Sequence, residues 1–347
     1  MKILYQFLVK DILAYFLMSL GFFLFIFIME KGLFLSKFLF KNIPISSFGY
    51  LLFLSLLPII SFTVPMGFLM AVILSWARLV ASSERVAIES CGISIKGLIL
   101  VTLSFGLCLS ICTSLINQRV VPSSLLKFNL LYDNLMKKKP NLLIEEKAFV
   151  NLENGDIYVE RVDEENLYQI YLTEENRTVF AKKGMVVKES NSLALNLFDG
   201  VIHQQDTDLS SYHMLRFSEH NLLLRKIEPE VVSEKKIYHY TGDELLKEAK
   251  KHRENPALLT EFHKREAISY ACFFFSLVGI GIGLRTKRRE KVIGFSASCL
   301  IILLYYILFI GCEAFGRKAG VSGLVMWLPN LILLLIGGGM LSVNRRQ

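Results

Sequence analysis

The sequence predicts an α+β membrane protein: six transmembrane helices, with an extracytoplasmic β-jellyroll domain inserted between helices 3 and 4. Three observations lead to this prediction. Hydrophobic residues make up 53% of the 347 residues and lie in six long unbroken runs, and a run of roughly 18 or more such residues is typical of a membrane-spanning helix. A long polar stretch with several short strand-forming segments separates the third run from the fourth. Lys and Arg gather beside the apolar runs, which indicates orientation in a membrane and not nucleic-acid binding, despite the net charge of +8.

The apolar runs define the six expected spans, at about 11–30, 48–76, 97–117, 265–284, 292–312 and 324–342. Lipid offers the backbone no water as a hydrogen-bond partner, so each span is expected to be helical. The second span contains Pro58 and Pro65, and each proline removes one backbone donor, so we expect this helix to be kinked. Gly279 and Gly283 form a small-residue pair in the fourth span, which favours close packing between helices.

The distribution of Lys and Arg predicts the orientation of these spans. One side of the membrane carries Lys2 and Lys10, the loop after the second span, the loop 285–291, and Arg345 and Arg346. Cytoplasmic loops carry an excess of such residues, so both termini are expected in the cytoplasm. The chain then divides into 1–118 (helices 1–3, with a short cytoplasmic helix at about 77–92), 119–264 (the outer β domain with a helix at either end) and 265–347 (helices 4–6).

The polar region 119–264 contains strand patterns. Residues 156–162 are rich in strand formers and follow an Asn-Gly turn signal. Leu193, Leu195 and Leu197 alternate with other residues and so share one face of a strand. Several short strands at regular spacing indicate a sandwich or jellyroll, and these three leucines are our candidates for its apolar lining.

Known catalytic and nucleotide-binding motifs are absent from the sequence. It has no GxxxxGK[ST] phosphate loop, no HExxH pair and no GxSxG elbow. Cys108 and Cys112 lie four residues apart on one helix face, but no His or further Cys joins them, which favours packing over metal binding. We therefore expect a non-catalytic chain that binds no metal and no cofactor.

The loop between the second and third spans has the features of a short helix. Ser82 or Ser83 can cap it, Glu84 falls in its first turn, and Gly92 can end it. Two interpretations remain open: the helix docks into a groove on a soluble partner, or it is a solvated loop helix whose Glu84 only stabilises its start. Its apolar side is expected to comprise Leu79, Val86 and Ile88.

Basic residues gather at the outer ends of the helices. Such residues can extend to any lipid headgroup, or a ring of them around one cavity can hold a phosphorylated headgroup. The full set is Lys31, Lys37, Lys41, Arg119, Lys127, Arg317 and Lys318. The candidates for headgroup contacts are Lys31, Lys37, Lys41, Arg317 and Lys318.

Several blocks of the chain are similar to one known family. The segment Arg78-Leu…Ser-Glu84…Cys91-Gly-Ile-Ser94 resembles a block of the LptF/LptG permeases, and Glu261-Phe-His-Lys-Arg265, Glu313-Ala-Phe-Gly-Arg317 and Trp327-Leu-Pro-Asn330 resemble later ones. The resemblance covers essentially the whole chain. Gly200-Val-Ile-His203 and Tyr212-His-Met-Leu-Arg-Phe217 are more like LptF than LptG.

The resemblance implies a function. Members are permease subunits of an ABC transporter in the bacterial inner membrane, which extracts lipopolysaccharide from the outer leaflet and passes it to a periplasmic bridge towards the outer membrane. The implied partners are the homologous permease (LptG or LptF), a dimer of the ATPase LptB, which binds ATP and Mg, and the periplasmic jellyroll proteins LptC and LptA.

The resemblance also assigns residues to the coupling with the ATPase. The glutamate of the family's coupling helix falls on Glu84, and Arg78, Arg85 and Ile88 lie beside it. This sequence has Glu89-Ser90 where many members have Arg-Ala, so the polarity of docking is expected to differ.

Two other functions are compatible with parts of the pattern. A permease of another ABC-type lipid or lipoprotein exporter usually has four spans and an outer domain between the first two, unlike this chain. A membrane-anchored structural or signalling receptor with a periplasmic β domain would need neither a basic cavity nor a helix for docking an ATPase. Co-purification with an ATPase separates the transporter subunit from the receptor.

Overall fold

The computed structural model describes residues 2–39, 45–138, 146–147, 149–152, 155–163, 166–174, 177–189, 192–205, 212–226, 236–251, 256–286, 291–318 and 323–344. They form two compact units. The helical unit comprises Met1–Phe128 and Lys235–Gln347, and the sheet unit comprises Asn129–Glu234.

Helices dominate the first unit, and α5 continues from it into the second. The described helices are α1 (Lys2–Leu39), α2 (Ile45–Ala81), α3 (Glu84–Ser90), α4 (Lys96–Leu115), α5 (Val121–Lys138), α6 (Gly242–Lys251), α7 (Pro256–Gly283), α8 (Lys291–Gly316) and α9 (Leu328–Asn344). Three short segments join them: the π-helix η1 (Ile116–Val120) and the 3-10 helices η3 (Ile237–His239) and η4 (Gly323–Trp327). Within the described chain, six helical stretches are long and apolar enough to cross a membrane, which confirms the predicted number.

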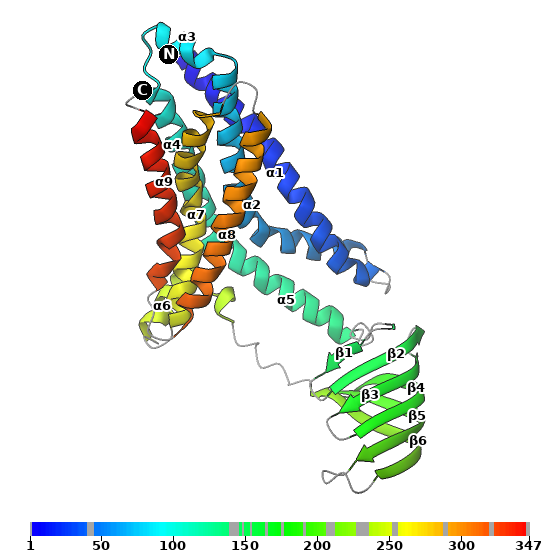
Figure 1. Cartoon of the computed structure of the whole chain (residues 1–347). Helices are drawn as coiled ribbons and strands as arrows, with labels where there is room; N and C mark the ends of the chain where they lie inside the picture. The colour runs from blue at the N-terminus through cyan, green and yellow to red at the C-terminus, as the bar shows by residue number, and fades with distance from the viewer. Residues whose placement is uncertain are drawn as a thin grey trace. The chain divides into compact units, whose positions relative to one another are not determined.

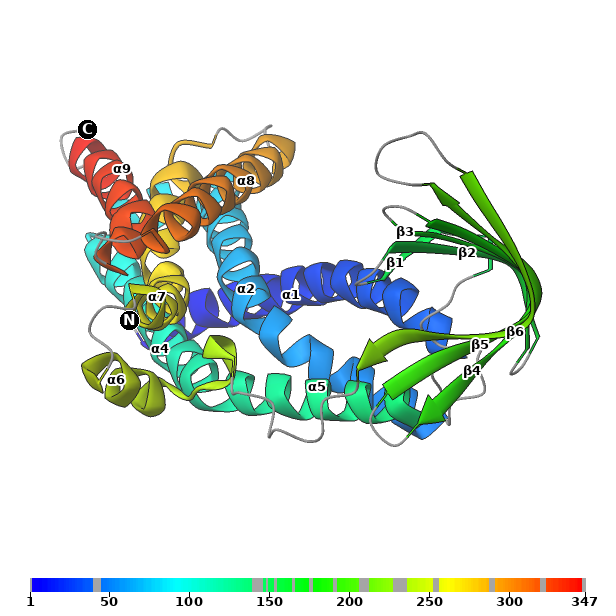
Figure 2. The same cartoon turned by 90° about the horizontal axis from the view of Figure 1, so that it is seen from below.

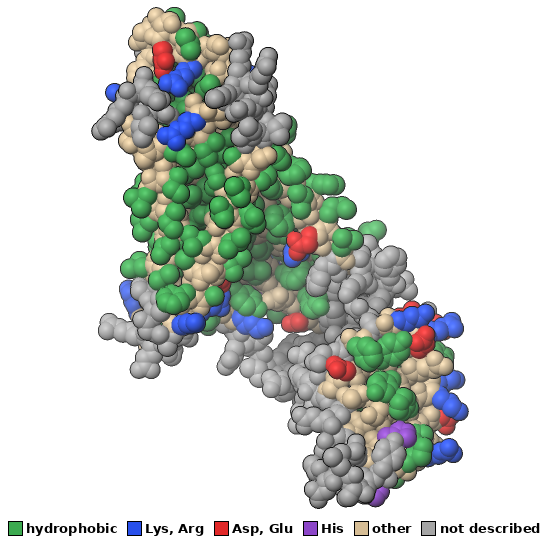
Figure 3. Space-filling view, viewed as in Figure 1, with side chains coloured by type: hydrophobic (Ala, Val, Ile, Leu, Met, Phe, Trp, Pro, Cys, Tyr) green, Lys and Arg blue, Asp and Glu red, His purple; other side chains and the backbone are tan. Residues whose placement is uncertain are grey.

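The helical unit is built around α7, which packs against α2, α4, α8 and α9 (Figure 1). A Cβ added at Gly279 would lie 2.9 Å from Val72 Cγ1, and one at Gly283 would collide with Trp76. The small-residue pair therefore lets α7 approach α2 closely, as the sequence predicts. Hydrophobic side chains cover the middle of the helical unit in Figure 3, and charged ones lie towards its two ends.

Helix α2 continues through Pro58 and Pro65 without ending. It changes direction along its length in Figure 1, as expected for a helix that lacks two backbone donors. The helix α6 packs through Leu245 and Ala249 on Leu258 of α7. For this reason α6 belongs to the helical unit, although it falls inside the polar region predicted at 119–264.

The sheet unit is one six-stranded antiparallel sheet whose strand order follows the chain. Its strands are β1 (Phe149–Leu152), β2 (Gly155–Asp163), β3 (Asn166–Glu174), β4 (Arg177–Glu189), β5 (Ser192–Gln205) and β6 (Tyr212–Lys226). The sheet curls strongly in Figure 2, so one face becomes a jellyroll-like interior. That face carries Ile157, Val159, Leu167, Ile170, Leu172, Val179, Ala181, Leu195, Leu197 and Leu222. The predicted β domain between the third and fourth spans is thus confirmed.

The sheet bends along one line that crosses five strands. Among the described strand residues, the register of paired residues passes over Glu160, Gln169, Lys182, Asp199 and Ser218, which lie opposite one another. Two consecutive residues of each strand face away from the interior at this level, so the alternation of inner and outer residues shifts by one. Such irregularities bend strands, and here they occur together, so the whole sheet folds over its apolar face.

Candidate functional site

The loop between α2 and α4 is the first candidate site, and its helix differs from the prediction. Residues 77–81 are the last residues of α2. The helix is interrupted at Ser82 and Ser83, and only Glu84–Ser90 form α3. Ser83 has φ 61° and its side chain makes no capping hydrogen bond, whereas Ser82 Oγ donates to the Arg78 carbonyl at 2.9 Å. The predicted single helix over 77–92 with a serine cap is therefore wrong: the Ser82 hydroxyl bonds back to α2 and does not cap the next helix. Gly92, at φ 74°, ends α3 as predicted.

The predicted apolar side of this helix is also divided between two faces. Leu79 and Ile88 are buried in the core of the helical unit, whereas Val86 is 63% exposed. Residues two apart on a helix differ in direction by about 200°, so Val86 and Ile88 cannot share a face. Ile88, a predicted docking residue, therefore packs α3 against the bundle, and Val86 is the residue of the predicted apolar side that is exposed.

The charged residues of this loop differ in how well they are paired. Arg78 Nε lies 2.7 Å from Asp11 Oδ2, and its guanidinium lies 5.0 Å from the Phe7 ring centroid. Arg78 therefore ties α2 to α1. Arg85 Nε lies 3.2 Å from the Glu89 carboxylate on the same helix. Glu84 is half-buried and makes no ion pair with any described residue.

A cavity of about 320 Å³ lies between α1, α2 and α5. Its lining consists of Lys31, Leu35, Ser55, Pro58, Ile59, Phe62, Leu125 and Phe128. The only charged group among these is Lys31, whose Nζ lies 3.2 Å from Glu30 Oε1. An apolar wall with one amine suits a ligand that has both a hydrocarbon part and an anionic group. Lys37 belongs to α1, but its side chain is outside the described part, as is the whole of Lys41.

Arg317 and Lys318 lie elsewhere, at the end of α8. Arg317 is bound within the chain, with its guanidinium 2.6 Å from the Glu313 carboxylate and 3.8 Å from that of Glu261. Lys318 is exposed, and its amine lies 5.9 Å from the Phe315 ring. No contact among the described residues joins either one to Lys31, and the ring of basic residues stays a prediction because the Lys37 side chain and Lys41 lie outside the described part.

Arg317 belongs to a cluster of ion pairs. The buried basic residue of this cluster is Arg265 on α7. Arg265 is 6% exposed and Glu261 is 8% exposed, and they lie 3.2 Å apart. Arg265 also donates to the Tyr240 carbonyl at 2.8 Å and to that of Tyr238 at 3.1 Å. It therefore anchors η3, the segment that enters α6, to the central helix. Lys264 completes the cluster, 2.8 Å from Glu313.

A second polar network lies within the helices, around the π-helix η1. Asn117 Nδ2 donates to Ser269 Oγ at 2.8 Å, and Ser61 Oγ donates to Asn117 Oδ1. Gln118 Nε2 donates to the Glu266 carboxylate at 2.7 Å. Sequence reasoning missed this network, although the polar pair Asn117-Gln118 at the end of an apolar run was a signal. π-Helical turns and polar residues inside membrane bundles often mark functional positions.

The interior of the sheet unit is an apolar cluster. Leu195 and Leu197 are fully buried on the inner face, as predicted. Leu193 lies in β5, but its side chain is outside the described part. The inner cluster is formed by aliphatic side chains from β2 to β6, so the inner face is apolar across these five strands.

Comparisons with known proteins agree with this architecture. The model of a family described as lipopolysaccharide export system permease LptF/LptG matches residues 6–342, which span both units. No curated protein matches the chain.

Proposed function

We propose a function that proceeds from one premise: this chain belongs to the lipopolysaccharide export system permease LptF/LptG family. The proposed function is that of the permease subunit of an ABC transporter, which extracts lipopolysaccharide from the outer leaflet of the inner membrane. The observation that carries the proposal is the family match over residues 6–342, because it includes the helices and the inserted sheet together. The chain itself is proposed to be non-catalytic, with ATP and Mg bound by a separate ATPase.

The proposed orientation has both termini in the cytoplasm and the sheet unit in the periplasm. It is supported by the excess of Lys and Arg near the termini and in the loops on the same side. Under this orientation α3 faces the cytoplasm, where an ATPase is available. The cavity beside Lys31 then lies towards the periplasmic end of α1.

Two apolar surfaces support the lipid path that we propose. The cavity between α1, α2 and α5 would receive part of the lipid, with Lys31 near its phosphate. The interior of the sheet would then shield acyl chains from water, since each exposed CH₂ costs about 0.8 kcal/mol. We propose LptC and LptA as the next carriers and a homologous permease as the partner in the membrane, and we propose that the chain itself is the LptF-like member of that pair.

Coupling to the ATPase is proposed to run through α3. Glu84 has no ion-pair partner among the described residues and Val86 is exposed beside it, so together they offer a charge and an apolar contact. Arg85 is a secondary candidate because Glu89 holds it. Arg78 and Ile88 support α3 from inside the bundle.

The test is reconstitution of the full chain with its partner permease and the ATPase in proteoliposomes that contain lipopolysaccharide. We expect ATP-dependent transfer of lipopolysaccharide to a soluble periplasmic acceptor, and co-purification of the ATPase with the chain. A receptor would bring down no ATPase. An exporter of another lipid would hydrolyse ATP but leave lipopolysaccharide in the liposome, and that result would overturn the proposal.

A further inference from the structure

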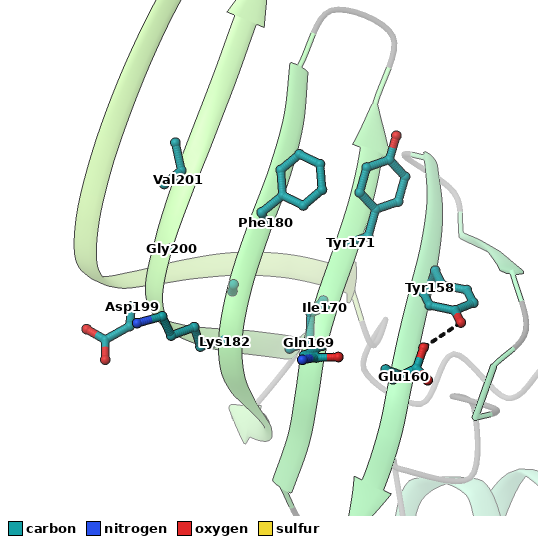
Figure 4. A pocket seen from close by; sticks show the side chains of 11 residues that line it. Tyr158, Glu160, Gln169, Ile170, Tyr171, Phe180, Lys182, Asp199, Gly200 and Val201 are labelled. Carbon is teal, nitrogen blue, oxygen red and sulfur yellow. Dashed lines mark hydrogen bonds between the residues drawn. The ribbon is translucent and has the colours of Figure 1, made fainter.

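A row of apolar side chains crosses the outer face of the sheet unit beside the bend. Tyr158, Tyr171, Phe180 and Val201 are cross-strand neighbours on β2 to β5, and they alternate with buried residues of the interior, so they occupy the opposite face. The rings of Tyr171 and Phe180 lie 4.8 Å apart, and Phe180 is 46% exposed. Figure 4 shows the four side chains in sequence across the strands. The three aromatic rings and Val201 form an open apolar surface, which we name the aromatic row.

A row of polar side chains runs parallel to the aromatic row. It consists of Glu160, Gln169, Lys182 and Asp199, four of the residues at which the strand register is interrupted (Figure 4). Gln169 and Asp199 have φ values of 53° and 51°, a left-handed conformation that is uncommon for residues other than glycine. Bulge-like irregularities often re-aim side chains next to binding sites, and backbone strain of this kind often lies at functional sites.

A cavity of about 380 Å³ lies over both rows. Tyr158 donates a hydrogen bond to Glu160 Oε2 at 2.7 Å, and this bond raises the pKa of Tyr158. The cavity thus combines a flat aromatic side with a polar side that offers two carboxylates, one amide and one amine.

We propose that this cavity binds a saccharide, the sugar part of the exported lipopolysaccharide; the choice of source rests on the proposed function. A sugar ring has an apolar face of C–H groups, which packs on aromatic rings, and a rim of hydroxyls. Each hydroxyl both donates and accepts hydrogen bonds. The aromatic row would receive the C–H face. The carboxylates and the Gln169 carbonyl would accept from the hydroxyls, and the Lys182 amine would donate to them.

Other ligand classes fit the cavity less well. An acyl chain would remove water from Glu160, Lys182 and Asp199 without giving them partners, which is costly. A phosphate would meet two carboxylates beside one amine, an unfavourable balance of charge. The inner face of the sheet has the opposite character, because its cluster is aliphatic. The two faces therefore suit the two chemical parts of one glycolipid.

Photo-cross-linking in membrane vesicles tests the proposal with the full chain. The photoreactive residue p-benzoylphenylalanine would replace Phe180 in the cavity, Leu197 in the interior, or Met214, which is 57% exposed on β6 and outside the cavity lining. With ATP and complete lipopolysaccharide, we expect lipid adducts at Phe180 and Leu197 and few at Met214. Lipopolysaccharide trimmed to its lipid A part should lose the adduct at Phe180 and keep that at Leu197.

Competitors identify the source of the saccharide. Soluble oligosaccharide from delipidated lipopolysaccharide should suppress the adduct at Phe180, and glycan fragments of peptidoglycan should not. Adducts at Leu197 alone would overturn the saccharide site and leave the proposed function intact, whereas no lipid adduct at either position would count against the proposed function. Adducts of Phe180 with a protein would assign this face to protein docking and overturn the saccharide site.

Matched variants provide a second test. Tyr171→Ala should weaken binding of the delipidated oligosaccharide to the full chain in detergent roughly tenfold, the effect of losing about 1.4 kcal/mol. Asp199→Asn, which keeps a residue tolerant of the left-handed conformation, should weaken it by a similar factor. Tyr168→Ala, on the same strand but outside the cavity lining, is the control and should bind normally. If all three variants bind the oligosaccharide as tightly as the unmodified chain, with unchanged unfolding curves, the assignment is overturned.

Discussion

Glu84 either docks α3 onto the ATPase or only stabilises the start of α3, and the two roles predict different free-energy costs when its charge is removed. Losing one partner of a buried charged pair costs about 3–5 kcal/mol, whereas losing a negative charge at a helix start costs about 0.3–1 kcal/mol. Because Glu84 has no ion-pair partner among the described residues, we expect Glu84→Ala to leave the fold intact. The variant should detach the ATPase or uncouple ATP hydrolysis from lipid transfer, as measured by ATPase recovery and lipid release.

The control for this prediction is Glu89→Ala on the same helix. Glu89 pairs with Arg85 on an exposed surface, and such pairs contribute about 0–1 kcal/mol, so this variant should be close to wild type. Normal ATPase recovery and normal lipid release by the Glu84→Ala complex would leave Glu84 with no role beyond the start of α3.

Arg265 and Arg317 share the partner Glu261 but differ in burial, and this gives a second prediction. Arg265→Ala would leave Glu261 with only the longer contacts to Lys264 and Arg317 and two backbone carbonyls without their donor, so we expect a loss of about 3–5 kcal/mol in the free energy of unfolding. Arg317 has a side chain that is 52% exposed, so Arg317→Ala should cost at most about 1 kcal/mol. Denaturant unfolding in mixed micelles would measure both. Equal losses would contradict the assignment of Arg265 as the anchor of η3.

At the scale of helices, the sequence predicted the membrane spans, which depend on the length of the apolar runs. It did not predict the helix break and the polar network, which depend on local contacts. Six spans follow from length and composition alone, because lipid requires helices there. The break before α3 did not follow, since Ser82 can either cap the next helix or bond back to Arg78, and both have the same sequence pattern. The network around Asn117 also depends on which helices become neighbours, and a single sequence does not show that.

The contact between α2 and α7 gives a prediction at the same scale. A Cβ at Gly279 would lie 2.9 Å from Val72 Cγ1, whereas one at Gly338 of α9 would meet nothing within 4 Å. Overpacking a tight contact costs about 1–3 kcal/mol, so Gly279→Val should lower stability by that amount and Gly338→Val should not. Thermal unfolding of the two purified variants makes the comparison. A Gly279→Val variant as stable as wild type would mean that the two helices pack less closely than described.

Over the whole molecule, the division into a helical unit and a sheet unit was predictable, but the way the sheet closes was not. The alternation at Leu195 and Leu197 predicted an apolar face correctly. The bend needs Glu160, Gln169, Lys182, Asp199 and Ser218 to fall at one level of five strands. That level is set by the register between strands, which the pattern of a single strand does not contain. For the same reason the polar row could not be predicted from the sequence.

The cavity that α1, α2 and α5 form together gives a prediction for the assembled molecule, because no single helix makes it. If Lys31 pairs with a lipid phosphate, Lys31→Ala should slow transfer of lipopolysaccharide about tenfold or more, since hydrogen bonds to charged groups contribute about 1.5–3 kcal/mol. The effect should shrink when the lipid lacks its phosphates, because the partner of the amine is then gone. Lys127→Ala is the matched control: Lys127 is exposed on α5 and outside the cavity lining. A lysine that merely extends to the membrane surface would show the same effect with both lipids, and transfer rates measured with the two lipids separate these roles.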